Sequence, residues 1–564
     1  MTPPEPRTPN GKPAGWRIHL LCASAVVPYL FLTLPRLDRP GVFFDEALTV
    51  MPLFGGGVPL RLGRFFLPLG KNSHNGALES YLAAPFVLFL GTTARTLHLA
   101  SVMFGAAALG FVFFACRNYF KDNRVAWMAA FLLGTLSPFV SSTYFGFLHS
   151  SAMVMFQAAA VWSLTRWRIT GRPRDLGLIF FCAGAALACR SWSGIATLTF
   201  LATAAALAAL FGRPWEIKRR LDLCRRFGVQ CAAAFFIGAF PLTLQVLSGG
   251  RQFTAAVGGR ILQGNGAAGS MDYSERVLWR LRQVRELGGG DPFLRGVFSS
   301  GDDSPRPVRA AAIAASMAWA ILACLAGARG FSLEQRLFCP LFVLLCIPIA
   351  ATMPGASVDL AYDHVLSALP LLMVSVAVFI VEASDLIARK LGRSIGVGIF
   401  LATGLLLRLE DIPKLQSRLA DMRGLNPYFS MGTAQAARWL AALPRGQIVF
   451  IEWEIAAPAT FLLGNRTPHM IGLLGEDSLS QLESTRGKKL YYLGYSPEMN
   501  RSLVPSDLRL RVECLGSSVK LVRSFQDLDQ TRLAAYEISA ATRLRPGDFV
   551  PRASSDSAAS CPPR

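Results

Sequence analysis

The chain has 564 residues, of which 52% are hydrophobic and only 16% are charged, and its mean hydropathy is +0.38. An ordinary soluble domain carries about a quarter charged residues, so this composition excludes that class and predicts a polytopic membrane protein. The net charge of +21 does not indicate a nucleic-acid-binding protein, because the basic residues recur in short clusters between apolar runs instead of forming one basic face.

The N-terminal residues 1–16 are Pro-rich, polar and basic, which predicts a disordered cytosolic tail. The apolar run that follows resembles a signal peptide, but many further apolar segments come after it. We therefore expect an uncleaved first membrane span. Most of the eleven cysteines lie in or beside apolar segments, where they are small packing residues, and no zinc-ligand spacing occurs.

Residues 17–410 contain the apolar segments that we expect to form a transmembrane module. About 20 apolar residues span a bilayer. Eleven segments meet this length approximately, and they are residues 17–35, 96–116, 125–143, 150–165, 176–190, 192–211, 228–247, 309–327, 337–353, 364–383 and 395–410.

The segment 77–91, "ALESYLAAPFVLFLG", is short and contains a glutamate and a proline. If it does not cross the membrane, the loops assigned to the cytosol are short and mostly basic, as the positive-inside rule demands. If it crossed, the rule would be inverted in every later loop. We therefore expect an interfacial or re-entrant helix within an outer loop of residues 36–95, with the N-terminus inside and the C-terminus outside the cell.

A second long outer loop, residues 248–308, contains "GNGAAG" at 264–269, which matches the dinucleotide-binding fingerprint GxGxxG. That fingerprint requires a preceding strand and a helix that opens at the glycines. The local sequence supplies neither, so we interpret this loop as a flexible segment that gates a substrate.

Residues 411–545 are no longer membrane-like and predict an extracytoplasmic α/β domain, followed by a disordered tail at 546–564. Alternating or β-branched runs predict strands, and two other segments predict helices. The expected strands are 446–453, 488–495, 519–525 and 532–538, and the expected helices are 433–444 and 476–487.

Two adjacent carboxylates, Asp45 and Glu46, stand in "GVFFDEALTV" just after the first span, on the predicted outer face. A charge at the lipid boundary is costly to dehydrate, and burial would raise the pKa of Asp45 unless a cation lay nearby. One interpretation is the start of an interfacial helix, whose dipole favours acidic residues. Another is a general base that deprotonates an acceptor brought to a lipid-borne substrate. The two are compatible.

Other polar residues also fall on the predicted outer face. We predict that they bind substrate and that His149 either binds a divalent metal such as Mg or Mn or orients the donor phosphate. Basic side chains such as Arg190, Arg260 and Arg276 would neutralise a phosphate leaving group. The candidates for substrate binding are His74, Glu79, Tyr81, Arg190, Arg260, Asp363 and His364.

The outer-facing Asp-Glu pair resembles the signature of the GT-C membrane glycosyltransferases, in particular the protein O-mannosyltransferases and lipid A aminoarabinose transferases. "HNGALESYLAAPFVLFLG", "ARTLHLASVMFGAAALG", "FFACRNYFKDNRVAWMAAFLLGTLSPFV" and "YDHVLSALPLL" resemble further segments of that family, covering roughly residues 17–165 and 355–385. In this sequence His149 stands where many relatives have an acidic residue, and Asp363 stands where the late motif has an arginine.

The resemblance implies an α-helical GT-C fold in the plasma (inner) membrane and a polyprenyl-phosphate sugar donor. It also implies an inverting transfer to a lipid, glycan or protein acceptor, with Asp45 as the base and Glu46 in support. Two alternatives are an inactive GT-C-like scaffold and a lipid-linked glycan transporter. A transporter usually shows repeats and mid-membrane charges, and this sequence shows no clear repeat and keeps its charges at span ends.

Overall fold

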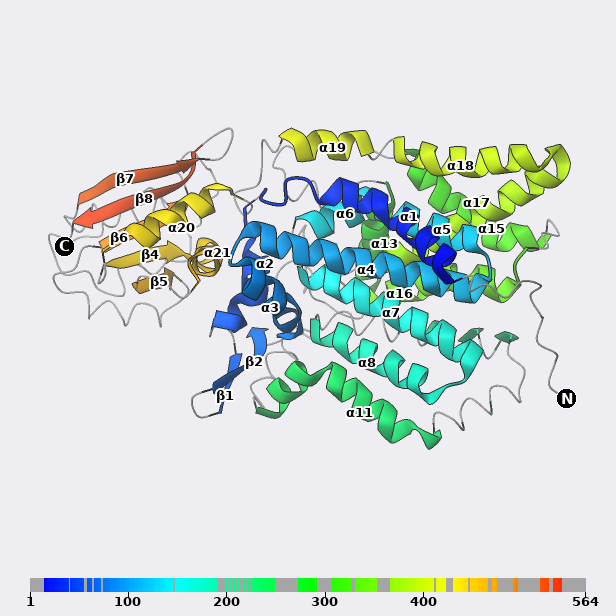
Figure 1. The fold of residues 1–564 in the computed structure, drawn as a ribbon, viewed down its shortest axis with the longest axis horizontal. Helices are drawn as coiled ribbons and strands as arrows, with labels where there is room; N and C mark the ends of the chain where they lie inside the picture. Colours follow the sequence, from blue (N-terminus) through cyan, green and yellow to red (C-terminus); the bar gives the residue numbers. More distant parts are fainter. Residues whose placement is uncertain are drawn as a thin grey trace.

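The computed structural model shows a bundle of helices with a separate mixed sheet at one end of its long axis (Figure 1). It describes residues 15–39, 41–54, 58–62, 65–72, 75–145, 148–189, parts of 199–222, 225–248, 272–289, 291, 307–325, 330–351, 366–409, 412–421, 430–444, 447–464, 469–473, 490–495, 518–526 and 531–539.

Helices occupy the predicted spans, except that 192–211 lies largely outside the described residues. The helices of the bundle are α1 (Gly15–Thr33), α4 (Ala94–Phe120), α5 (Asn123–Gly134), α6 (Ser137–Tyr144), α7 (Leu148–Thr170), α8 (Pro173–Cys189), α11 (Gly228–Gly238), α13 (Tyr273–Gly289), α15 (Pro307–Leu325), α16 (Leu333–Ala351), η5 (Leu366–Ala368), α17 (Leu369–Leu391) and α18 (Arg393–Leu409).

Three helices in the described part of the chain are long and apolar enough to cross a membrane, Trp16–Thr33, Ala94–Phe120 and Leu366–Leu391. Two bent pairs raise this number to five if each pair is one span. These are α5 with α6, bent by 57°, and α11 with Phe240–Ser248, bent by 83°. The count of eleven spans stays a prediction.

The turn between α4 and α5 shows how local sequence ends one helix and begins the next. Lys121 takes a left-handed conformation (φ 59°) and closes α4. Asp122 then caps α5 by accepting a 2.7 Å hydrogen bond from the backbone N–H of Arg124. This capping satisfies a helix-terminal donor at the start of α5, and α4 and α5 pack against each other on the two sides of the turn.

Close packing joins the bundle helices, because lipid offers no hydrophobic driving force between them. Tyr29, Phe113 and Phe139 are at most 1% exposed in the central cluster of apolar side chains. Between α8 and α11, Gly184 and Gly238 face each other's helix. A Cβ on either glycine would lie 2.1 Å from a carbonyl oxygen of the opposite helix. These two helices therefore pack backbone to backbone.

The segment 36–95, which we predicted to be an outer loop, contains more regular structure than the sequence predicts. It forms α2 (Phe44–Val50), η1 (Met51–Phe54), a small antiparallel sheet and α3 (Leu78–Leu90). The helix at 78–90 agrees with the predicted interfacial helix at 77–91. The sheet was not predicted, and its strands are β1 (Val58–Leu62), β2 (Phe65–Asn72) and β3 (Asn75–Gly76).

The segment 248–308, which we predicted to be a second outer loop, is described only in part. Its residues 273–289 form α13, which packs against α15 and α16, so this part of the loop is not the flexible segment that we expected. Tyr273 and Arg276 hydrogen-bond to the carbonyl oxygens of Pro348 and Ala351, at 3.2 and 2.9 Å. These bonds fix α13 to the end of α16. The "GNGAAG" motif lies outside the described residues.

The C-terminal domain is a five-stranded mixed sheet of order β5-β4-β6-β8-β7. β4 is parallel to β5 and β6, and β8 is antiparallel to β6 and β7. All four predicted strands are present, but β5 and α21 were not predicted. The elements are α19 (Ile412–Asp421), α20 (Gly432–Ala442), β4 (Ile448–Glu452), α21 (Trp453–Leu463), β5 (His469–Leu473), β6 (Leu490–Tyr495), β7 (Ser518–Gln526) and β8 (Thr531–Ser539). The helix predicted at 476–487 lies outside the described residues.

Candidate active site around helix α2

Asp45 and Glu46 lie in the first turn of α2, which confirms the interpretation of "FFDEALTV" as the start of a short helix. Their environments differ completely. Asp45 is exposed, whereas Glu46 is fully buried. The burial that we considered for Asp45 falls on its neighbour instead, because successive helical positions differ by about 100° and of the two carboxylates only Glu46 turns inward.

The carboxylate of Glu46 faces His98 at the start of α4. Glu46 Oε2 lies 3.4 Å from His98 Nε2, and both side chains are 0% exposed. Burial raises the pKa of the Glu46 carboxyl, and the nearby imidazole and the Phe43 backbone offset only part of that rise. Glu46 is thus a buried contact between α2 and the bundle and does not reach solvent.

His98 also fixes the turn that leads from α1 to α2. Its Nδ1 lies 2.8 Å from the carbonyl oxygen of Leu37, and because a carbonyl only accepts, Nδ1 carries the proton and donates. The Tyr144 hydroxyl donates to the carbonyl of Arg36 at 2.9 Å, and its ring stacks on His98 with centroids 6.4 Å apart. These two hydrogen bonds fix the backbone at Arg36 and Leu37, in the turn that leads to α2.

Helix α3 contacts α2 and the small sheet through polar groups. The Ser80 hydroxyl donates to the carbonyl of Thr49 in α2, and both residues are buried. The Tyr81 hydroxyl donates to the carbonyl of Pro68 at 2.5 Å, and partial burial raises its pKa to about 12, so it stays protonated at neutral pH. Glu79 is fully buried in the same helix. The hydrogen bonds of Ser80 and Tyr81 therefore join α3, which also carries Glu79, to α2 and to the small sheet.

His149 lies at the start of α7 and is only 2% exposed. Within the ranges that the structure describes, no three His, Cys, Asp or Glu side chains converge as metal ligands. The described residues thus form no built metal site, and metal binding at His149 stays a prediction.

Five predicted substrate-binding residues lie outside the described residues. They are His74, Arg190, Arg260, Asp363 and His364. Their proximity to Asp45 stays a prediction.

Sequence reasoning missed His98 and Asp291. His98 carried a weak signal, since a histidine near the start of a predicted span needs a polar partner. Asp291 accepts hydrogen bonds from Ser137 and Ser141, the latter at 2.9 Å, at the start of α6. The two ends of this contact are more than 140 residues apart, and no sequence pattern linked them.

A family model described as dolichyl-phosphate-mannose-protein mannosyltransferase matches residues 75–224. The structure is similar to that of ArnT from Cupriavidus metallidurans bound to undecaprenyl phosphate, with a TM-score of 0.55 and 13% identity over 93% of this chain and 98% of that chain. The same enzyme in the apo state gives a TM-score of 0.56 and 12% identity over 96% of this chain and 100% of that chain. The chain has the fold of the GT-C membrane glycosyltransferases.

The resemblance stated from the sequence is thereby confirmed at the level of fold. No curated protein sequence matches the chain. At 12–13% identity the solved structures establish the GT-C architecture and leave the donor, the acceptor and the roles of individual side chains to chemical argument.

Proposed function

We propose that this GT-C protein is an integral-membrane glycosyltransferase that moves a sugar from a polyprenyl-phosphate donor to an acceptor. The acceptor is a lipid, a polysaccharide or a protein on the extracytoplasmic face, and Asp45 is the general base. The match to a dolichyl-phosphate-mannose-dependent family and the likeness to an enzyme that binds undecaprenyl phosphate support this donor class.

The observation that carries the proposal is the contrast in burial between two adjacent carboxylates in the first turn of α2. Asp45 is exposed, and its neighbour Glu46 is buried against His98. An exposed carboxylate beside a buried anchor is suited to proton abstraction, because its position is fixed while an acceptor can approach it from solvent. Glu46 in this arrangement is a positioning residue.

The proposed reaction is a single displacement. Asp45 accepts the proton of the acceptor hydroxyl or amine as the acceptor's oxygen or nitrogen bonds to the anomeric carbon. The bond from that carbon to the donor phosphate oxygen breaks, and polyprenyl phosphate leaves. Attack from the face opposite the phosphate inverts the anomeric configuration. Arg190 and Arg260 are the proposed partners of the phosphate, since guanidinium binds it in a bidentate manner.

The proposed location is the inner membrane, with α2 and the C-terminal domain outside the cytosol. The mostly basic loops that follow α4 and α7 support this orientation through the positive-inside rule. Nucleic acid is not a partner in this proposal.

The first test is the release of polyprenyl phosphate by membranes that contain wild-type protein, Asp45→Asn or the control Asp38→Asn. The membranes receive a panel of polyprenyl-phosphate sugars and a cell-envelope acceptor extract. We expect Asp45→Asn to lower the rate by about 10²- to 10⁴-fold, the usual contribution of a general base. Asp38 is exposed outside α2 and its variant should retain the wild-type rate.

If Asp45→Asn releases polyprenyl phosphate at the wild-type rate, Asp45 is not the general base. If neither protein releases lipid phosphate with any donor, the inactive-scaffold and transporter alternatives become the better readings.

A further inference from the structure

Helix α21 of the C-terminal domain has two buried faces, each with helical spacing. Ile455, Ala459 and Leu463 belong to the apolar core of the domain. Ala457 and Phe461 instead belong to the central apolar cluster of the membrane module, and Phe461 is 0% exposed. One helix is therefore shared between the two cores.

The partner of the second face is the segment that carries the proposed base. α21 packs against α2 and η1, and the rings of Phe461 and Phe54 meet edge to face with centroids 6.1 Å apart. Ala47 and Val50 of α2 are fully buried in the same cluster. In Figure 1, α2 and α3 lie between the bundle and the C-terminal sheet.

A backbone contact joins the same two parts just before α2. A Cβ added to Gly41 would lie 2.0 Å from the carbonyl oxygen of Ser430, and Ser430 lies two residues before α20. No side chain fits there without moving one of the two segments. A third contact is made by Arg36, whose Nη1 donates to the carbonyl of Ala420 at the end of α19 at 3.0 Å.

Helix α2 cannot hold its own orientation. Isolated helices below roughly 12–15 residues are marginal in water, and α2 has seven residues. Its direction is therefore set by its contacts, with Glu46–His98 on the bundle side and α21 on the domain side.

We propose that the C-terminal domain is a positioning element of the active site, which holds α2 through Phe461 and Gly41 so that Asp45 faces the reacting atoms. This proposal rests on the proposed function of Asp45. It differs from a role of this domain in recognising the acceptor. A misplacement of about 1 Å costs up to about 10²-fold in rate, so loss of this contact affects turnover more than binding.

The test compares Phe461→Ala with Thr460→Ala in the full-length protein in detergent. Thr460 is a matched control on the same helix, because its hydroxyl donates only to Ala456 of that helix at 2.8 Å. Hydrogen exchange measures the amide exchange rates of residues 44–50, α4 and strands β4 and β6. Turnover of the donor gives kcat and KM. Phe461→Leu, which restores apolar volume, serves as the rescue variant.

In Phe461→Ala we expect exchange in α2 to rise on the order of tenfold. Protection in α4, β4 and β6 should stay unchanged, which shows that both parts remain folded. We expect kcat to fall by on the order of 10- to 100-fold while KM for donor and acceptor stays within about twofold. Thr460→Ala should match wild type, and Phe461→Leu should recover most of the loss.

Gly41→Ala is an independent variant, because it adds one methyl group outside the domain at the contact with Ser430. It should reproduce the fall in kcat and the faster exchange of α2 with the sheet still protected. Unchanged exchange in α2 with a raised KM for the acceptor alone would overturn the proposal in favour of acceptor recognition.

Loss of protection in β4 and β6 for both variants would also overturn the proposal, since it would reveal a general stability role. Failure of the proposed function is recognised separately. In that case wild-type protein releases no polyprenyl phosphate, while the exchange measurement still shows whether the domain orders α2.

Discussion

At the scale of single residues, two adjacent carboxylates occupy opposite environments. Burial raises the pKa of Glu46, so the folded protein binds this proton more tightly than the unfolded chain does. The stability from this group is fully present below its unfolded pKa of about 4.3 and is lost as pH rises through the higher folded pKa.

We therefore predict that Glu46→Gln flattens the pH dependence of the thermal midpoint in detergent between about pH 4 and 8. His98, whose imidazole faces the carboxylate, remains in place in this variant. Asp222→Asn, which changes an exposed carboxylate, is the control and should keep the wild-type slope. An unchanged slope in Glu46→Gln would mean that Glu46 does not titrate differently in the folded protein.

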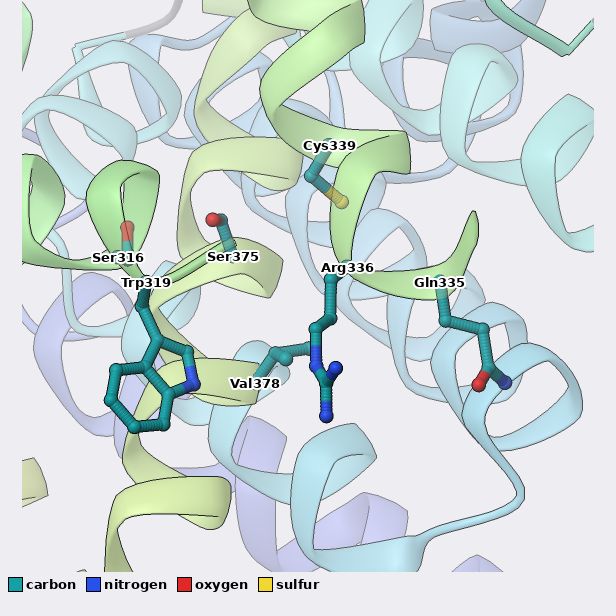
Figure 2. Close-up of a pocket in the computed structure, with 7 residues that line it drawn as sticks. All are labelled: Ser316, Trp319, Gln335, Arg336, Cys339, Ser375 and Val378. Atoms are coloured by element: carbon teal, nitrogen blue, oxygen red, sulfur yellow. The ribbon is translucent and has the colours of Figure 1, made fainter. Parts of the chain in front are cut away.

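At the scale of elements, a buried ion pair joins α15, α16 and α17. Glu382 accepts a 2.7 Å bond from Arg336 Nη2 and a 2.8 Å bond from Trp319 Nε1, and both charged side chains are at most 4% exposed. Trp319 and Arg336, which are drawn in Figure 2, line a cavity of about 10 Å³, which is space for one water molecule at most. The ion pair of Arg336 with Glu382 therefore connects helices and does not line a ligand site.

Removal of one partner leaves the other charge buried, so we predict that Glu382→Ala destabilises the protein by about 3–5 kcal/mol. The double variant Glu382→Leu with Arg336→Met should recover most of this loss, because apolar replacement of a buried pair is often neutral. Denaturant unfolding in detergent measures both. If the single variant proves as stable as wild type, the pair does not hold these helices together.

At the scale of the whole molecule, the predicted membrane orientation follows from the charge of the loops and puts the proposed active site outside the cytosol. We predict that Lys520→Cys in β7 reacts with a membrane-impermeant maleimide in intact cells, and that Arg172→Cys, between α7 and α8, reacts only after lysis. Both positions are exposed. Seven of the eleven cysteines are described by the structure and are buried, and wild-type protein labelled in parallel measures the background from the other four. The reverse labelling pattern would invert the topology.

The fold was predictable from the sequence where the signal is local and repeated. Apolar segments of span length, the 78–90 helix and strands β4, β6, β7 and β8 follow from composition and periodicity. The small sheet of residues 58–76 was missed because its strands are short and contain Gly and Pro, which sheet propensities disfavour. α21 was missed because its apolar run directly follows a strand and serves two cores.

The sequence by itself determined that this is a membrane protein, where most helices of the bundle lie and which two carboxylates are candidates for the base. It also determined the GT-C resemblance, since an acidic pair after a first span is a local pattern. Only the tertiary structure decided that Asp45 is exposed and Glu46 buried, that His98 is the partner of Glu46 and that α21 packs against α2. These facts depend on contacts between segments that are about 50 to 400 residues apart, and no local propensity encodes such contacts.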